Sequence, residues 1–403
     1  MNKFPLDGIR VLDFTFMWAG PYATMLLGFM GAEVIKVESQ RRLDTIRIFD
    51  LVNLQMLEDI NMSPIFNDIN LSKLGINLDL KNTKAIEIAK RLIEKCDVVM
   101  ENMRPGVMDR LGLGYEVACE LNPSIIYLAS SSRGAKGPER NYTGYAPSFG
   151  ALSGLSNVTG HPNDPPSTIG GEIDLLSGLT SVYAILAALN YRKSTGEGQY
   201  IDQSSSEAGS VLIGELFMDY FMNGNVQTRQ GNMDDHMAPH NCYPCKGENK
   251  WISIAIETED EWLSFCNAIG NPEWTRDDRF SDVKSRLVNR EELDKLISEW
   301  TMIYDPYEAM RRLQSAGVAA VQKYNSQDLF SDPHLKERDF AMKVTHPAIG
   351  DMICLAPPFK YSTLSVKFEH APLFGQHNNY IFGELLGMSE NEILKLREDG
   401  VIG

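Results

Sequence analysis

Alternating apolar and helix-like segments in the first third of the chain constrain its fold more than any other feature. Ile9–Phe14 is a short apolar run, Gly20 and Pro21 open an apolar-periodic segment, and Ala32–Val37 is a second apolar run. A proline in the first turn is typical of a helix start. A strand, a helix and a strand within about thirty residues form a βαβ unit, which predicts a parallel sheet.

The alternation continues toward the middle of the chain. Strand-like and helical segments follow one another at Ile76–Leu80, Thr83–Lys95, Asp97–Glu101 and Ser124–Ser130. A long apolar helix is then expected from Asp174 to about Arg192, followed by a strand at Tyr200–Gln203 and a helix at Glu207–Met222. These repeated units predict a doubly wound, Rossmann-like α/β domain.

The pattern changes after Gly224. Cys242–Cys245 and Trp251–Ile256 flank a turn and predict a β-hairpin. Further helices are expected at Glu259–Ile269, Arg290–Met302 and Pro306–Ala316, and the tail adds strand-like and helical segments at Asp351–Lys360 and Asn378–Leu386. Because 403 residues exceed what one core usually organises, residues 225–330 are a candidate second, smaller α+β domain.

The charge of the chain argues against some partners. It carries 38 basic and 54 acidic residues, which gives a net charge of −16 at pH 7. Nucleic acids and anionic membranes bind through basic patches, so neither is expected as a partner. Basic residues nevertheless gather at predicted strand ends of the first half, where α/β sheets bind ligands: Lys36, Arg41, Arg42, Lys73, Arg104, Arg110, Arg133 and Lys136. They suit either a local phosphate-binding surface or a solvated face.

Six cysteines in so long a chain do not form a disulfide framework and favour a reducing compartment. Cys242 and Cys245 form a CxxC pair, which His236 and His240 would complete to a zinc site. No second cysteine pair follows, so we interpret the two cysteines as buried thiols and expect no metal.

The chain shows no targeting signal. Its amino terminus lacks the long apolar segment and cleavage site of a signal peptide. The most apolar stretch, Ile173–Leu189, is interrupted by polar residues and is expected to be too short to span a bilayer. We therefore expect a cytoplasmic protein.

The turn of the first βαβ unit argues against a dinucleotide site. Glu38 stands where a ribose-binding acid would lie, but Met17–Pro21 lacks GxGxxG, so we expect no NAD. What remains is a helix start that is either simply capped or able to hold an anion. No GxSxG elbow occurs either. Asp174, taken alone, is an acid at a helix start, whose ordinary role is to cap the helix or pair with its dipole.

A series of short stretches runs from end to end in an order shared with one known family. They are Leu6–Phe14, Ala19–Pro21, Gly31–Glu38, Asn77–Leu80, Glu101–Gly106, Asp109–Gly112, Asn122–Pro123, Thr195–Gln199, Asp332–Pro333 and Ala371–His377. Together they resemble class III CoA-transferases, the group that contains formyl-CoA, carnitine and benzylsuccinate CoA-transferases and α-methylacyl-CoA racemase. The resemblance covers nearly the whole chain.

The resemblance implies an architecture. A large CoA-binding α/β domain would be built from residues 1–224 and 331–403, with linker helices near 205–224, around the inserted domain 225–330. It further implies a homodimer whose two chains interlock like rings, or a pair formed with a homologous subunit.

The resemblance also implies that Asp174 is the catalytic nucleophile, because Glu172–Gly178 matches the family's carboxylate before an apolar helix. A carboxylate with a pKa near ~4 is ionised at neutral pH and needs no general base. Its attack on an acyl-CoA would give a mixed anhydride and then an aspartyl-CoA thioester, from which CoA passes to an acceptor acid. Backbone N–H groups near a helix start would stabilise the oxyanions, and water must be kept out.

Contacts with CoA carry over from the family by position. They fall on Trp18, Ala19, Ser39, Arg41, Leu71, Ser72, Lys73, Leu74, Asn102, Met103, Arg104 and Arg110. Family members often have a basic residue at Ser39 and a Lys-Arg pair at Lys73 and Leu74. Arg41 or Arg42 is expected to supply the missing charge.

Three alternatives are weighed against a transferase of this kind. The racemase adds a histidine base where this chain has Tyr145, and formyl-CoA transferases have a glycine-run loop where it has Gly231–His240. The chain is therefore expected nearest the carnitine and benzylsuccinate branch. A non-catalytic CoA-binding protein is the third alternative, against which an intact Asp174 argues. Tyr145, His236 and His240 are the candidate residues for the acid substrate.

Overall fold

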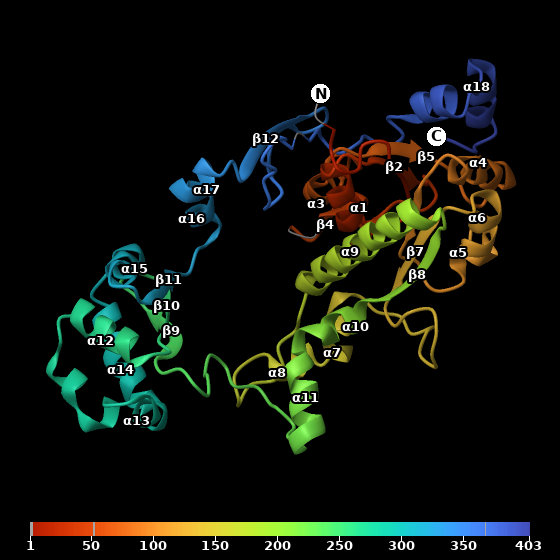
Figure 1. The fold of residues 1–403 in the computed structure, drawn as a ribbon. Coiled ribbons are helices and arrows are strands. Elements are labelled where there is room, and N and C mark those ends of the chain that lie inside the picture. Colours follow the sequence, from red (N-terminus) through yellow and green to blue (C-terminus); the bar gives the residue numbers. More distant parts are fainter. Residues whose placement is uncertain (1–2, 51–52, 367) are drawn as a thin grey trace. The chain divides into compact units, whose positions relative to one another are not determined.

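The computed structural model describes residues 3–50, 53–366 and 368–403 and divides the chain into two compact units (Figure 1). The large unit comprises the chain up to Ser156, Thr168–Val226 and Glu337–Gly403, and the small unit comprises Asn157–Ser167 and Gln227–Lys336. The sequence had placed residues 157–167 in the large domain, and this is corrected. Gly231 N donates to Gly160 O at 2.8 Å, and Arg229 donates to the carbonyls of Asn157 and Asp164, which joins the segment to the small unit.

A six-stranded parallel sheet forms the centre of the large unit. Its strands, in the order β5-β2-β1-β6-β7-β8, are Leu74–Asn77, Glu33–Glu38, Arg10–Asp13, Val98–Glu101, Ile126–Ser131 and Gln199–Ser204. The expected α/β class with a large parallel sheet is confirmed. The strand order reverses between β1 and β6, and ligands bind beyond the carboxyl ends of strands at such a point.

Helices cover both faces of this sheet. One face packs on α1 (Ala19–Phe29) and α9 (Gly171–Thr195) through apolar residues such as Val34 and Leu128. The other packs on α4 (Thr83–Ile93), α6 (Tyr115–Leu121) and the chain's carboxyl-terminal helices. The remaining elements before β8 are α2 (Thr45–Ile48), β3 (Phe49–Asp50), β4 (Gln55–Met56), α3 (Pro64–Ile69), α5 (Val107–Arg110), α7 (Ala146–Leu152) and α8 (Leu155–Val158).

The long helix α9 has 25 residues and begins three residues before Asp174. By length and composition alone it would cross a membrane, so the expectation that this stretch is too short is wrong. Of its most apolar stretch, 39% is buried inside the protein, where α9 packs on α1 and the sheet. The core helix of a soluble protein can have the same length and apolar composition. The expected helix at 207–222 is divided into α10 (Ser205–Ser210), a 3₁₀ turn η1 (Val211–Ile213) and α11 (Gly214–Asn223).

The small unit has its own core beneath a three-stranded antiparallel sheet. The predicted hairpin is present as β9 (His240–Pro244) and β10 (Trp251–Ala255), and the chain adds β11 (Ala319–Gln322). The expected helices are also present as α12 (Glu259–Ala268), α14 (Arg290–Thr301) and α15 (Pro306–Ser315). Shorter elements complete this part of the chain: η2 (Glu273–Arg276), η3 (Asp278–Phe280), α13 (Val283–Val288), α16 (Ser326–Ser331) and α17 (Pro333–Glu337).

The carboxyl-terminal segment returns to the large unit and covers the edge strand β5. It contains β12 (Ala341–His346), β13 (Gly350–Leu355), a π-helix η4 (Asn379–Leu385) and α18 (Glu390–Glu398). Gly75 N donates to His377 Nδ1 at 3.0 Å, and His377 N donates back to Gly75 O at 2.9 Å. Asn77 N donates to Asn378 Oδ1 at 2.9 Å. His377 and Asn378 thus occupy the place of a seventh strand beside β5.

Candidate active site

The loop between β1 and α1 leaves the sheet where the strand order reverses. Asp13, the last residue of β1, accepts hydrogen bonds from Thr15 N at 2.9 Å and from Thr24 Oγ1 at 2.7 Å. Its Oδ2 atom lies 3.0 Å from Lys73 Nζ. Burial alone would raise the pKa of Asp13, but the ammonium groups of Lys73 and Lys36 lower it to about 2. A buried ion pair therefore fixes the start of the loop.

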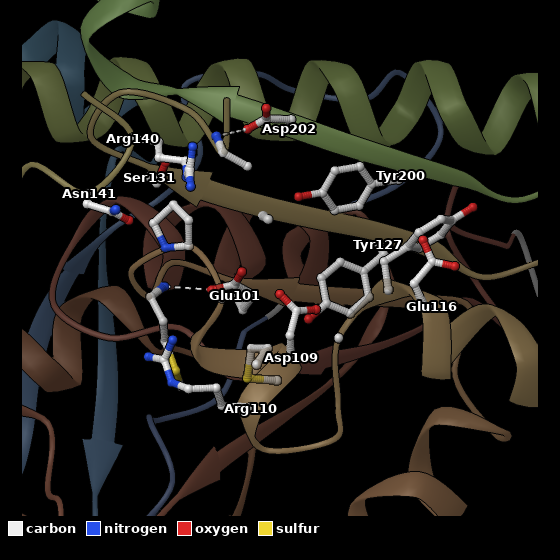
Figure 2. A pocket seen from close by; sticks show the side chains of 18 residues that line it. Glu101, Asp109, Arg110, Glu116, Tyr127, Ser131, Arg140, Asn141, Tyr200 and Asp202 are labelled. Atoms are coloured by element: carbon white, nitrogen blue, oxygen red, sulfur yellow. Dashed lines mark hydrogen bonds between the residues drawn. The ribbon is translucent and has the colours of Figure 1, made fainter. Parts of the chain in front are cut away.

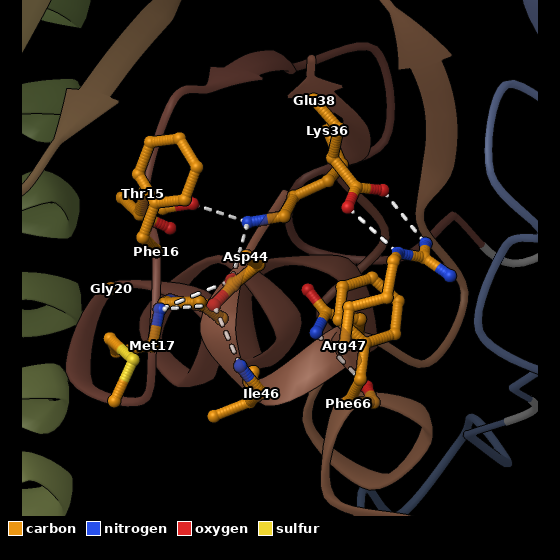
Figure 3. A network of polar contacts seen from close by, with 12 residues as sticks. Thr15, Phe16, Met17, Gly20, Lys36, Glu38, Asp44, Ile46, Arg47 and Phe66 are labelled. Atoms are coloured by element: carbon orange, nitrogen blue, oxygen red, sulfur yellow. Dashed lines mark hydrogen bonds and ion pairs between the residues drawn. The ribbon is translucent and has the colours of Figure 1, made fainter. Parts of the chain in front are cut away.

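Three other parts of the large unit hold the next residues of the loop. Lys36 Nζ, from β2, donates to the carbonyl oxygen of Thr15. The Asn102 side chain accepts from Phe16 N and donates to Phe16 O, both at 2.8 Å. Both carboxylate oxygens of Asp44 lie 3.1 Å from Met17 N, which donates to them. Figure 3 shows Lys36 and Asp44 converging on this loop.

Asp174 lies in the first turn of α9. Among the residues that the structure describes, none donates a hydrogen bond to its carboxylate or forms an ion pair with it. Burial raises the pKa of Asp174 to about 6, so the expectation of an ordinary value is corrected. The carboxylate still outnumbers the acid about tenfold at pH 7. An unpaired and partly desolvated carboxylate of this kind is suited to attack a carbonyl carbon.

Gly178, one turn after Asp174, brings α9 against the start of α1. A Cβ atom on Gly178 would lie 2.9 Å from Ala19 O and 2.9 Å from Tyr22 Cδ1. Because residues four apart share a helix face, Asp174 lies on the face that meets α1. The start of α1 has no side-chain cap, and the N–H groups of Ala19 and Gly20 meet no acceptor within the described ranges. Asp174 thus lies one turn from the place where α9 meets the uncapped start of α1.

Several residues expected to contact CoA surround this loop. Trp18 and Ala19 form the start of α1, and Asn102 holds Phe16 from the end of β6. Met103 N donates to Glu101 Oε2 at 2.6 Å. Arg104 and Arg110 follow in the next loop and in α5, and both are exposed. The structure therefore brings this group together at the carboxyl ends of β1 and β6.

Ser39 and Arg41 follow β2 at the same edge of the sheet. Arg41 Nε lies 3.0 Å from Asp79 Oδ2, so its charge is already paired. Ser39 forms an isolated bridge with Arg42, whose guanidinium lies 5.3 Å from the centre of the Phe16 ring. Of the two arginines, Arg42 therefore places its charge beside the loop.

The residues before β5 are less accessible than expected. Lys73 is fully buried, and its Nζ donates to Asp13, to Pro21 O at 2.8 Å, to Thr24 Oγ1 at 2.7 Å and to Asn70 Oδ1 at 2.9 Å. The expected CoA contact from the Lys73 side chain is therefore corrected, because its donors are committed to the interior. Leu71 is also buried, Ser72 Oγ accepts from Glu369 N at 2.8 Å, and Leu74 begins β5.

The candidate residues for the acid substrate lie in different units. Tyr145 precedes α7 in the large unit, and its side chain is 70% exposed. His236 and His240 belong to the small unit, where His240 Nδ1 lies 2.7 Å from Asn232 O.

Two other motifs have structural roles. Glu38 accepts hydrogen bonds from Arg47 Nε at 2.8 Å and Nη2 at 2.7 Å, so it is buried in an ion pair and does not face a ribose. Cys245 is buried as expected, but Cys242 is only half-buried, with its Sγ 3.1 Å from Ser253 Oγ. No group of three or more potential metal ligands occurs in the described part of the chain.

A cavity of about 530 Å³ lies along one face of β7 and β8 and reaches the carboxyl end of β6 at Glu101, and sequence reasoning missed it (Figure 2). Its walls include Glu101, Arg110, Tyr127, Tyr200 and Asp202. Burial raises the pKa of Glu101 to about 8, so this carboxyl is protonated at neutral pH. Arg110 is shared between the cavity and the expected CoA contacts.

Lys36 and Asp44 are the loop-holding residues that sequence reasoning also missed. In the sequence, Lys36 is identified only as one of the basic residues at predicted strand ends, and Asp44 is not identified as a candidate residue. The available signal was a lysine between Ile35 and Val37 in a predicted strand, because a fully buried cation needs an internal acceptor.

Comparisons with known proteins agree on one family. A family model described as CoA-transferase family III matches residues 6–378. The chain is 32% identical to succinyl-CoA–D-citramalate CoA-transferase of Chloroflexus aurantiacus over 99% of this chain and 98% of that protein. It is 34% identical to succinyl-CoA:mesaconate CoA-transferase of Haloarcula hispanica over 96% and 98%. A CAIB/BAIF family protein from Brucella suis has a similar crystal structure, with a TM-score of 0.85, 29% identity and coverage of 95% and 100%.

Proposed function

The chain belongs to CoA-transferase family III and is a CoA-transferase, and from this premise we propose that Asp174 carries CoA during the transfer. The observation that carries the proposal is the Asp174 carboxylate, which is partly buried, unpaired among the described residues and one turn from the contact of α9 with the uncapped start of α1.

Asp174 performs the chemistry in two symmetrical halves. Its carboxylate attacks the carbonyl carbon of the donor acyl-CoA, the C–S bond breaks, and a mixed anhydride and CoA thiolate result. The aspartyl carbonyl is then attacked by the thiolate, which releases the donor acid and leaves an aspartyl-CoA thioester. The acceptor carboxylate reverses these steps, and Asp174 is regenerated. This reaction needs neither a metal nor NAD.

The surroundings of Asp174 support this role. Each tetrahedral intermediate carries an oxyanion, and preorganised N–H donors are the usual means of stabilising such a charge. The start of α1 has no side-chain cap and packs on α9 at Gly178, one turn from Asp174, so we propose the N–H groups of Ala19 and Gly20 for this role. Burial removes part of the hydration of the Asp174 carboxylate, which a nucleophile must shed before it attacks, and the same desolvation raises the pKa of Asp174.

The named relatives support a substrate class. One is named for succinyl-CoA and D-citramalate and the other for succinyl-CoA and mesaconate. We therefore propose succinyl-CoA as donor and a short dicarboxylic acid as acceptor, with Tyr145 contacting the acid. The roles of His236 and His240, which belong to the small unit, stay predictions. Arg42 and Arg110 are the exposed cations proposed to meet the CoA phosphates. Membership of the carnitine and benzylsuccinate branch stays a prediction.

We propose that two copies of the chain form an interlocked homodimer in the cytoplasm, without nucleic acid or membrane as partners. The helix α11 supports this, because none of its side chains is buried and Phe217, Tyr220 and Phe221 are exposed on it. Apolar area of this kind is normally covered by a partner protein.

The test is intact-protein mass spectrometry after incubation with a panel of acyl-CoAs, succinyl-CoA among them. We expect a CoA-sized adduct that hydroxylamine removes, and Asp174→Ala should lose it. Glu172→Gln is the matched control, since Glu172 is an exposed acid in the same helical turn, and it should keep the adduct. Exchange of the α-proton with deuterium in place of any adduct would replace the transferase mechanism by that of a racemase.

A further inference from the structure

The backbone of the loop before α1 is held unusually completely. From Thr15 N to Met17 N, every polar backbone group accepts from or donates to a buried or half-buried side chain: Asp13, Lys36, Asn102 and Asp44. Met17 has a φ of 62°, a left-handed conformation that non-glycine residues adopt only when their surroundings enforce it. Something must therefore hold Met17 in place, and the bond from its N–H to Asp44 is the contact that does so.

Asp44 is itself rigidly placed. Its side chain is 1% exposed, and it caps α2 by accepting from Ile46 N at 3.3 Å. Lys36 Nζ lies 3.9 Å from its Oδ2 atom, although burial outweighs this attraction and raises the pKa of Asp44. Arg47, in the same short helix, is fixed by Glu38 and packs over Phe66 with its guanidinium 3.6 Å from the ring centre. Figure 3 shows this chain of contacts from Glu38 to Met17.

The conformation of Met17 decides where α1 begins and which way its first turn faces. Trp18 and Ala19 follow directly, and Gly20 packs so closely on Thr15 that a Cβ atom there would lie 2.4 Å from Thr15 Cβ. Ala19 O in turn meets Gly178 on α9. A shift at Met17 would therefore be passed to the first turn of α1.

We propose that Asp44 is a positioning residue for CoA transfer, which holds Met17 so that the first-turn N–H groups of α1 face the acyl carbonyl bound at Asp174. The inference rests on the proposed role of Asp174. Asp44 touches no reacting atom, and it acts through the loop.

Two substitutions separate this role from helix capping. Asp44→Ser keeps a good N-cap for α2 but is too short to reach Met17 as well. Asp44→Asn keeps one carbonyl oxygen for both Met17 and Ile46, but it loses the charge and the second acceptor oxygen, which faces Lys36. Ser63→Ala is the control, because Ser63 is an equally buried cap, of α3, and does not touch the loop.

The measurement is the rate of CoA adduct formation from succinyl-CoA in a single turnover, together with the amplitude, which counts competent sites. We expect Asp44→Ser to lower the rate constant about 10- to 100-fold, since misplacement of reacting groups by about 1 Å has effects of this size. The amplitude should stay within about twofold of wild type. Asp44→Asn should recover most of the rate, and Ser63→Ala should leave it unchanged.

The outcomes distinguish this inference from the mechanism beneath it. A wild-type rate in Asp44→Ser would overturn the positioning role while the adduct itself upheld Asp174. A reduced amplitude with an unchanged rate constant would also overturn it, because Asp44 would then only stabilise the fold. Absence of an adduct in the wild type would remove the proposed function instead.

Discussion

Asp174 combines a reactive carboxylate with a cost to the folded state. Burial raises its pKa to about 6, and nothing in the described ranges pairs with it. A lowered pKa is what ion-paired carboxylates such as Asp13 show. The contrast indicates that Asp174 is kept unpaired in a place where the fold would be better served by a neutral side chain.

The pH dependence of the first half-reaction follows from this value. Only the ionised form attacks, so the rate of adduct formation should be level above pH 7 and fall about tenfold per unit below pH ~6. Stopped mixing with succinyl-CoA at several pH values measures this without a free acceptor acid. A rate that stayed level down to pH 5 would show an ordinary pKa and contradict the effect of burial.

The same shift predicts a stabilised but inactive variant. Between the unfolded value near 4 and the folded value near 6, the folded state binds more protons, so the free energy of unfolding falls as pH rises through this window. This decrease in the free energy of unfolding is complete above pH ~6. Asp174→Asn removes the ionisable group, and it should therefore raise the free energy of unfolding by roughly 1–3 kcal/mol at pH 7.5. Urea titration at pH 7.5 and pH 4 checks this, and the difference between the proteins should vanish at the lower pH.

At the residue scale, sequence reasoning reached Asp174 only through the family resemblance, since from its position alone it is a helix cap. It did not reach Asp44 or the buried state of Lys73. Their partners lie far away in sequence: Lys73 is 60 residues from Asp13, and Asp44 is 27 from Met17. Hydrophobic periodicity reports which face of an element is buried, but it does not report which distant polar group a buried charge will meet.

At the scale of elements, the contact of α9 with α1 is the part on which the site most depends. Gly178 allows the two helices to approach where Asp174 lies one turn away. Gly178→Ala should force them apart, lower the free energy of unfolding by about 1–3 kcal/mol and slow adduct formation. Gly171→Ala is the control, because a Cβ at Gly171 meets nothing within 4 Å. Thermal unfolding and the adduct rate should both be unchanged in the control, and equal behaviour of the two variants would refute the close-packing argument.

Strong periodic patterns made most elements predictable. The strands β1, β2, β6 and β7 and the helices α1 and α4 lie within a few residues of their expected positions, because each has an apolar run or stripe and a clear start signal. The short strand β11 and the helix α18 were missed. Both depend on packing against segments distant in sequence, and neither has a long apolar pattern of its own.

At the scale of the whole molecule, the exposed apolar side chains of the large unit predict its assembly. Phe221 is 84% exposed and Phe217 is 58% exposed on α11. We expect the chain to sediment as a dimer, and Phe217→Glu combined with Phe221→Glu to reduce the dimer fraction. Leu263→Glu, on an exposed face of α12 in the small unit, is the control. A wild-type monomer would contradict the proposed homodimer.

The cover over β5 has a consequence for how the chain is made. The ribosome releases all six strands of the sheet once Ser204 has emerged, yet the groups that satisfy Gly75 and Asn77 belong to His377 and Asn378. Throughout the synthesis of the intervening residues, the nascent sheet therefore presents a bare edge to neighbouring polypeptides. A messenger RNA that ends before His377 would yield a chain that contains Asp174 and most of the core but keeps β5 as an exposed, aggregation-prone edge. The β5 edge is thus covered only after the carboxyl-terminal segment has been synthesised.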